Sequence, residues 1–374
     1  MSLTARAAMM GRELGGVVPR SLAVLKRAED WNPLSTRGIR QLGEVALDEL
    51  VVTAMTLLAP PPQLRTHVDS YRAVAEELAA LGVDGVHSAP DALQVREIRH
   101  RRAGLLAYEQ LTYEHDPRLP ASLDSANVTG PATAVCNLLR HADGPRPWLV
   151  WVHGAGQGGL SDFAVARINR IHHRLGYNVA MPVQPGHGVR ANAWPAYPDT
   201  DPLVNVAGLI RVVSEVRAVL GWLTGQSTSI VVSGLSLGSA VAALTAGVDD
   251  RVDAVAVYTP IRGLNAMIAN HLHRWGTAAD EVGSVLASDV VSQLTAVIDP
   301  LSVQPLVPPE RRLIVGAWYD QMAMRAPAQA LHNSWGGELY WHDGGHVGHL
   351  FAGGVQAVTE RFLRRVATEC RSPG

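Results

Sequence analysis

The chain has 374 residues, 47% of them hydrophobic and 18% charged, a composition that excludes a disordered protein and allows a large core. The formal net charge of -2 gives no electrostatic basis for a nucleic-acid partner. The two cysteines, Cys136 and Cys370, are too few for a disulfide framework or a zinc ligand set.

Residues 1–90 have the pattern of a helical extension. Apolar side chains recur at helical spacing over Gly38–Ala59 and over Val68–Leu81, and Pro60–Pro62 separate the two segments. These apolar faces suit packing on a catalytic domain, with contact to a membrane surface as the alternative. Basic residues interrupt residues 1–30, so no signal peptide is predicted, and no apolar run is continuous enough to span a bilayer. A cytoplasmic protein is therefore expected, membrane-associated in the alternative.

The rest of the chain predicts a mostly parallel sheet with helices on both faces. Leu93–Tyr113 has the alternation of a hairpin, and further strands are predicted at 132–139 and 148–152. Strands and helices then alternate, which is typical of an α/β fold. The elements expected there are a helix over Asp162–Leu175, strand 177–182, helix 202–223, strand 229–232, helix 237–246, strand 252–258, strand 312–317, helix 327–332, strand 338–341 and helix Val355–Thr368.

A helical segment of mixed polarity interrupts this alternation. This segment, residues 261–300, is predicted to be a small helical cap. The chain is then expected to have three parts: an extension (1–90), a catalytic domain (91–260 and 301–374) and the cap (261–300).

The pentapeptide Gly234-Leu235-Ser236-Leu237-Gly238 is the strongest chemical signal in the sequence. A G-x-S-x-G motif is short and recurs by chance, so its context decides its weight. Here a strand-like run, Ile230–Val232, precedes it and a helical run follows it, as a strand-to-helix turn that exposes a nucleophilic serine requires. Ser236 is therefore the predicted nucleophile.

Two backbone amides are candidates for an oxyanion hole. The first is the amide of Leu237, at the N-terminus of the helix behind Ser236. The second is the amide of Ala155, in the loop His153-Gly154-Ala155-Gly156 that follows a buried strand. The alternative for this loop is a phosphate-binding turn, but it lacks the Lys-Ser/Thr ending of a P-loop.

Together these features resemble the α/β-hydrolase superfamily, over roughly Trp148–Arg365. The order of strand, His-Gly loop, Pro185-Gly186-His187-Gly188 turn, serine elbow, acid and histidine is similar to that of the family. The resemblance implies an α/β-hydrolase fold, a structural role for His153, and a catalytic triad in the chain order Ser, acid, His.

The resemblance directs the search for the acid to a late strand. Leu313–Asp320 ends in a carboxylate, and Asp320 is the candidate acid, with a helix N-cap as its alternative role. Asp299 precedes a proline and is typical of a turn.

The histidine is expected after the next strand. His346 lies in a loop whose glycines are expected to let the imidazole turn back over the elbow. His342, at a strand end, and His349, expected to open the final helix, are its competitors.

These residues predict a serine hydrolase that cleaves carboxylic esters through an acyl-enzyme intermediate. The stretch Leu264–Trp275 and the N-terminal helices are expected to roof an apolar pocket, or else to pack as ordinary helices. A small-molecule ester is the expected partner; no cofactor is implied, and neither His172 with His173 nor His271 with His273 has metal-ligand spacing. Thioester hydrolysis, peptide cleavage and acyl transfer would use the same triad. A non-catalytic binding or scaffold protein is the alternative from another class.

Overall fold

The computed structural model describes residues 3–28, 31–126, 128, 130, 132–192 and 197–370. Within them a nine-stranded sheet has the order β1-β2-β3-β5-β4-β6-β7-β8-β9, antiparallel from β1 to β5 and parallel from there to β9. The strands are β1 (Gln94–Ala103), β2 (Leu106–Glu114), β3 (Thr133–Leu139), β4 (Arg146–Val152), β5 (Asn178–Val183), β6 (Ser227–Leu235), β7 (Ala254–Tyr258), β8 (Arg312–Ala317) and β9 (Glu338–His342). The predicted hairpin and parallel strands are thus present.

Two cores form because the central strands are apolar on both faces. In β4, Trp148 and Val150 belong to one core, whereas Leu149 and Trp151 belong to the other. Helices α8 (Pro202–Leu223), α9 (Leu237–Val248) and α13 (Ala326–Trp335) contribute to the first core. Helices α6 (Asp162–Val165), α7 (Ile168–Leu175) and α14 (Gly353–Glu369) contribute to the second. The sheet is therefore covered on both faces, as predicted.

The parallel direction of the central strands positions the candidate site. Strands β6, β8 and β9 end at Leu235, Ala317 and His342, and the carboxyl ends of parallel strands share one edge of a sheet. The loops that carry Ser236, Asp320 and His346 leave from that edge.

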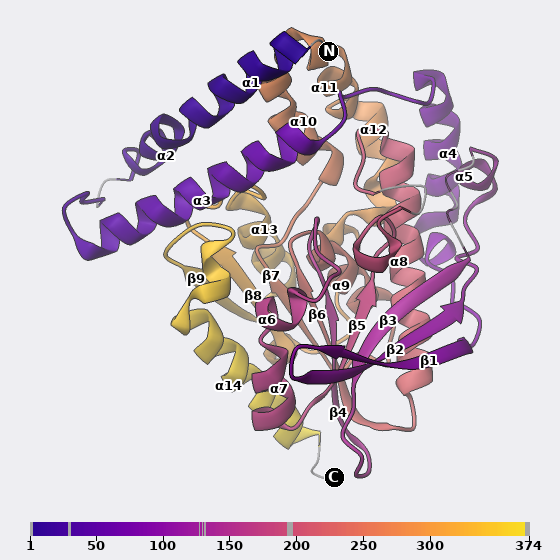
Figure 1. Ribbon diagram of the computed structural model, residues 1–374. Helices are drawn as coiled ribbons and strands as arrows, with labels where there is room; N and C mark the ends of the chain where they lie inside the picture. Colours follow the sequence, from indigo (N-terminus) through magenta and orange to yellow (C-terminus); the bar gives the residue numbers. More distant parts are fainter. Residues whose placement is uncertain are drawn as a thin grey trace.

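The N-terminal helices lie at the same end of the molecule as the helices between β7 and β8 (Figure 1). A buried ion cluster joins the two groups, because Arg274, 4% exposed, lies 3.2 Å from Glu13 and 2.9 Å from Glu49. The helices in question are α1 (Leu3–Gly15), α2 (Val17–Leu25), α3 (Thr36–Leu58), α4 (Val68–Val86), α10 (Leu264–Leu272), α11 (Asp280–Leu286) and α12 (Asp289–Leu294). Among the helices of the described ranges, none combines the length and the apolar character needed to cross a bilayer.

Some predicted elements differ from the observed ones. The single helix expected over Asp162–Leu175 is wrong: Arg167 adopts a left-handed conformation with φ 51° and divides the segment into α6 and α7. The short helix α5 (Ala121–Ser125) was not predicted. The remaining short elements are 3₁₀ turns: η1 (Gly188–Arg190), η2 (His273–Ala279), η3 (Ala296–Ile298), η4 (Pro300–Ser302), η5 (Pro309–Arg311) and η6 (Gly348–Phe351).

Candidate active site

Ser236 occupies the sharp turn between β6 and α9. Its backbone has φ 51° and ψ -115°, a sparsely populated conformation, and its amide donates a 2.9 Å hydrogen bond to the carbonyl of Tyr258 on β7. The two glycines of the motif are needed because the backbone packs closely here. A Cβ on Gly234 would overlap the carbonyl of Gly238, and a Cβ on Gly238 would overlap the carbonyl of Val152. The pentapeptide thus forms the strained turn that its sequence predicts.

Ser236 borders a cavity of about 250 Å³ that is mostly apolar. Helix α3 forms one wall and helix α10 another, and the proline segment after α3 closes part of the rim. The apolar side chains come from Val52, Met55, Ile261, Leu264, Met267, Ile268, Leu272, Trp275 and Met322. Both groups of helices expected to roof a pocket therefore line this one.

The two predicted oxyanion donors border the same cavity. Ala155 and Leu237 line it together with Ser236. In the described part of the chain, neither backbone amide donates to another group, whereas the amide of Gly154 is occupied by Oε1 of Gln157 at 2.8 Å. Two amides are therefore available beside the serine, one of them at the N-terminus of α9.

Asp320 and His346 are hydrogen-bonded partners. Nδ1 of His346 lies 2.8 Å from Oδ2 of Asp320, and both side chains are buried. The other carboxylate oxygen, Oδ1, accepts hydrogen bonds from the amides of Met322 and Ala323, each 2.8 Å long. Asp320 thus holds the following turn and contacts the imidazole at the same time, whereas the N-cap of the next helix, α13, is Arg325 and not Asp320.

The surroundings of His346 favour its protonated form more than water favours that of a free histidine. Burial opposes the imidazolium, but the charge and hydrogen bond of Asp320, together with the charge of Asp48, raise the pKa of His346 above its ordinary value. An Nδ1–H directed at Asp320 leaves Nε2 as the basic atom.

Among the described residues, no hydrogen bond joins Nε2 of His346 to the Ser236 hydroxyl. In the described part of the chain, the Ser236 hydroxyl makes no hydrogen bond, and Nε2 lies 3.5 Å from Oγ1 of Thr259, at the limit of a hydrogen bond. Thr259 directly follows β7, the strand whose Tyr258 carbonyl accepts the amide of Ser236. Catalytic hydrogen bonds are often long in the absence of substrate, so this looser geometry is compatible with the predicted pair.

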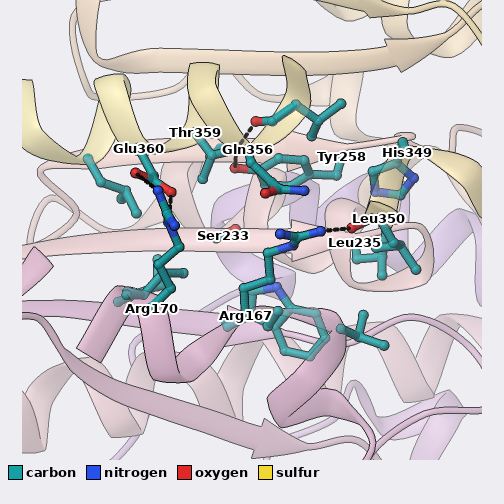
Figure 2. A pocket seen from close by; sticks show the side chains of 18 residues that line it. Arg167, Arg170, Ser233, Leu235, Tyr258, His349, Leu350, Gln356, Thr359 and Glu360 are labelled. Atoms are coloured by element: carbon teal, nitrogen blue, oxygen red, sulfur yellow. Dashed lines mark hydrogen bonds and ion pairs between the residues drawn. The ribbon is translucent and has the colours of Figure 1, made fainter. Parts of the chain in front are cut away.

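The competing histidine His349 faces a different pocket. Its Nδ1 contacts the carbonyl of His346, and burial lowers the pKa of His349 to about 3, so its ring stays neutral. Figure 2 shows His349 with Tyr258 and Leu350 around this second pocket, which has a volume of about 80 Å³ between the sheet and helices α7 and α14. Ser236 is not among its lining residues. The predicted preference for His346 over His349 is consistent with this placement.

His153 and His342 have structural partners. Nδ1 of His153 lies 2.8 Å from the carbonyl of Gly154, and Nε2 accepts the amide of Gln184 at 3.0 Å. Burial lowers the pKa of His153 to about 3. His342 pairs with Glu44 of α3 through Nε2 at 2.6 Å. In the described part of the chain, no cluster of three or more His, Cys, Asp or Glu side chains is placed to hold a metal ion.

Two carboxylates of α3 that the sequence did not identify hold the His346 loop. Glu44 accepts the amide of Gly345 at 3.1 Å, and Asp48 accepts the amides of His346 and Val347 at 2.6 and 2.9 Å. In the sequence, Glu44 and Asp48 are recognisable only as two acidic residues four positions apart in a predicted helix. This spacing does not indicate what they contact.

No protein-family model matches the sequence. The chain is 28% identical over 363 residues to an uncharacterized protein found in two strains of Mycobacterium tuberculosis, a match that covers 91% of this chain and 86% of that protein.

Two acetyl xylan esterases have similar structures. The enzyme from a Thermoanaerobacterium species matches with a TM-score of 0.53 at 12% identity, over 82% of this chain and 95% of that one. The enzyme from a Paenibacillus species matches with a TM-score of 0.51 at 14% identity, over 81% of this chain and 96% of that one. The chain has the α/β-hydrolase fold. The nine-stranded sheet, the elbow after β6 and the covering helices agree with the predicted fold class.

Proposed function

We propose that the protein is a serine hydrolase that cleaves carboxylic esters through an acyl-enzyme intermediate. The observation that carries the proposal is the 2.8 Å bond between Asp320 and the buried His346, at the same sheet edge as the strained Ser236. The same fold carries esterases in the two solved structures described above, so it accommodates this chemistry.

In the proposed reaction the Ser236 hydroxyl attacks the ester carbonyl while Nε2 of His346 accepts its proton. Asp320 keeps the proton of the imidazole on Nδ1 and stabilises the imidazolium that forms. The amides of Ala155 and Leu237 would donate to the oxyanion. His346 then returns the proton to the leaving alcohol, and water repeats the sequence on the acyl-enzyme.

The size and apolar lining of the cavity support the proposal that it binds an apolar acyl group and so determines which esters are preferred. A dry cavity of about 150 Å³ accommodates benzene, so by proportion a cavity of about 250 Å³ takes roughly ten non-hydrogen atoms. An acyl chain of medium length has this size, and burying each methylene contributes about 0.8 kcal/mol. We therefore propose medium-chain esters as better substrates than acetate esters.

Labelling with a fluorophosphonate probe tests the nucleophile. The wild-type protein should be labelled, and Ser236→Ala should abolish the label because only an activated serine reacts at a useful rate. Ser233→Ala is the matched control, since Ser233 is a buried serine of β6, the strand that leads into the elbow, and borders the second pocket instead (Figure 2). Equal labelling of the wild type and Ser236→Ala would refute the assignment.

Two properties can be tested together: the type of bond cleaved and the preferred length of the acyl chain. The test is a panel of p-nitrophenyl esters of increasing chain length, run beside the matching acyl-CoA thioesters. Higher kcat/KM on esters, with an optimum above acetate, is the expected outcome. A clear preference for thioesters would convert the proposal into a thioesterase with the same triad.

A further inference from the structure

Helix α3 turns one continuous face toward the candidate site. Its first half contacts the loop of His346, and its second half borders the cavity beside Ser236. Residues on this face follow one another at helical spacing. They are Arg37, Arg40, Gln41, Glu44 and Asp48 against the loop, then Val52, Met55 and Thr56 at the cavity.

Asp48 is the member of this face that lies closest to the predicted acid and base. One carboxylate oxygen, Oδ2, accepts the amides of His346 at 2.6 Å and Gln321 at 3.3 Å, and Oδ1 accepts the amide of Val347 at 2.9 Å. Gln321 directly follows Asp320 in the chain. A single carboxylate therefore ties the backbone of the base to the backbone beside the acid.

Asp48 makes these hydrogen bonds in the protein interior and not at the surface. The side chain is fully buried, and burying a carboxylate is unfavourable unless hydrogen bonds compensate it. Burial, together with the negative charge of Asp320, raises the pKa of Asp48 to about 6, while the charge of His346 and the amides of Val347 and His346 act in the opposite direction. The carboxylate is thus largely ionised at neutral pH.

The glycines around His346 give an independent reason to regard this contact as specific. A Cβ on Gly345 would overlap the carboxylate of Asp48, and a Cβ on Gly344 or Gly348 would overlap that of Glu44. None of the three has a positive φ, so backbone freedom does not explain them. Glycine is needed there because the carboxylates of α3 approach the loop backbone directly, which differs from the expected purpose of freeing the imidazole.

We propose that Asp48 is a positioning residue: from helix α3 it fixes the His346 loop against Asp320 and adds a second negative charge beside the imidazole. This inference rests on the proposed hydrolase function. It makes the N-terminal extension part of the machinery that orients the base, and it links that base to the wall of the substrate cavity through a single helix.

Asp48→Asn tests both effects, geometry and charge. The asparagine keeps the shape but replaces one acceptor oxygen by an NH2 group that faces backbone amides. We expect kcat to fall roughly 10- to 100-fold, as for a misplaced catalytic group. KM for p-nitrophenyl acetate should change little, because Asp48 is not among the cavity-lining residues.

The pH profile provides a readout that a purely structural role would not move. The titratable groups that face Asp48 are His346 and Asp320, and Glu44 lies one turn away with its own partner, His342. Asp48 contributes to the raised pKa of His346, and His346 must be neutral to act as the base. Removing the charge should therefore shift the acidic limb of kcat/KM toward lower pH.

Glu49→Gln is the matched control. Glu49 is the next residue of the same helix and is also buried, but it pairs with Arg20 and Arg274, away from the His346 loop. It should lose stability without any shift of the acidic limb. A shift of the same size in Glu49→Gln would show that any loosening of α3 produces the effect and would overturn the specific role of Asp48.

The failure of this inference differs from the failure of the proposed function. Wild-type protein without fluorophosphonate labelling or esterase activity would refute the function itself. An active wild type with an unchanged kcat and acidic limb in Asp48→Asn would refute only the role of Asp48. If Asp48→Asn is insoluble, Gly345→Ala provides the test. The added Cβ would push the His346 loop away from the Asp48 carboxylate, which is itself retained. An unchanged kcat in Gly345→Ala would overturn the proposal.

Discussion

Replacing Asp320 with asparagine should separate orientation of the base from folding. Oδ1 of Asp320 accepts the amides of Met322 and Ala323, and an asparagine carbonyl can replace it. The amide NH2 then occupies the position of Oδ2 and faces Nδ1 of His346. Because an NH2 group can only donate, the imidazole must place its proton on Nε2 and no longer accepts one from Ser236.

The magnitude follows from the loss of the reactive tautomer. The corresponding change in a well-studied serine protease lowers kcat about 10⁴-fold, which corresponds to about 5 kcal/mol of transition-state stabilisation. The turn is retained, so the free energy of unfolding should fall by no more than about 3 kcal/mol, the largest contribution expected of a hydrogen bond to a charged group. Activity should therefore fall far more than stability.

Hydrolysis of a p-nitrophenyl ester at neutral pH, with urea unfolding in parallel, measures both quantities. Asp299→Asn is the control, because Asp299 caps a turn through the amide of Leu301 at 2.9 Å and makes no contact with the predicted triad. It should keep full activity. If Asp320→Asn retained more than about a tenth of wild-type kcat, the orienting role derived from the structure would be wrong.

Two further predictions concern the cavity and the base. Ile268→Trp adds six non-hydrogen atoms to a cavity that takes roughly ten, so the optimal acyl chain should shorten by about six carbons, as a chain-length panel would reveal; an unchanged optimum would place the acyl chain elsewhere. His346 must be neutral to accept a proton, and its pKa is raised above the ordinary value of 6.5, so kcat/KM should fall as the pH decreases through a pKa above 6.5. A pH–rate profile checks this, and an acidic limb below 6.5 would contradict it.

Much of the fold was predictable because its signals are local. The apolar runs that form β4 and β6 alternate with helical segments, and this alternation specifies a parallel sheet covered on both faces. The elbow was predictable for a similar reason, since two glycines around Ser236 meet a backbone contact that only glycine permits. Arg167 has no such local signal, and the break that it makes between α6 and α7 was therefore missed.

The pairing of Asp320 with His346 needed the chain order of a known fold in addition to local pattern. Each residue follows a strand of the parallel sheet, so the topology brings the two loops to one edge, and the structure brings the side chains to 2.8 Å. Their catalytic roles stay predictions until activity is measured. Sequence position favoured His346 over His349 without showing where either side chain lies. The structure distinguishes them because it places His349 beside a different pocket (Figure 2).

The contribution of helix α3 could not be predicted because it depends on contacts between residues about 300 positions apart. The carboxylates of Glu44 and Asp48 look like the solvated side of an amphipathic helix, which is the usual place for charged residues. Only the folded chain shows that this polar face is turned inward, where backbone amides of the His346 loop replace water as hydrogen-bond donors. A buried carboxylate persists only if it is fully hydrogen-bonded, so the inward face of α3 and the glycine-rich loop have to fit each other. The extension is for this reason better understood as part of the candidate site than as an accessory to it.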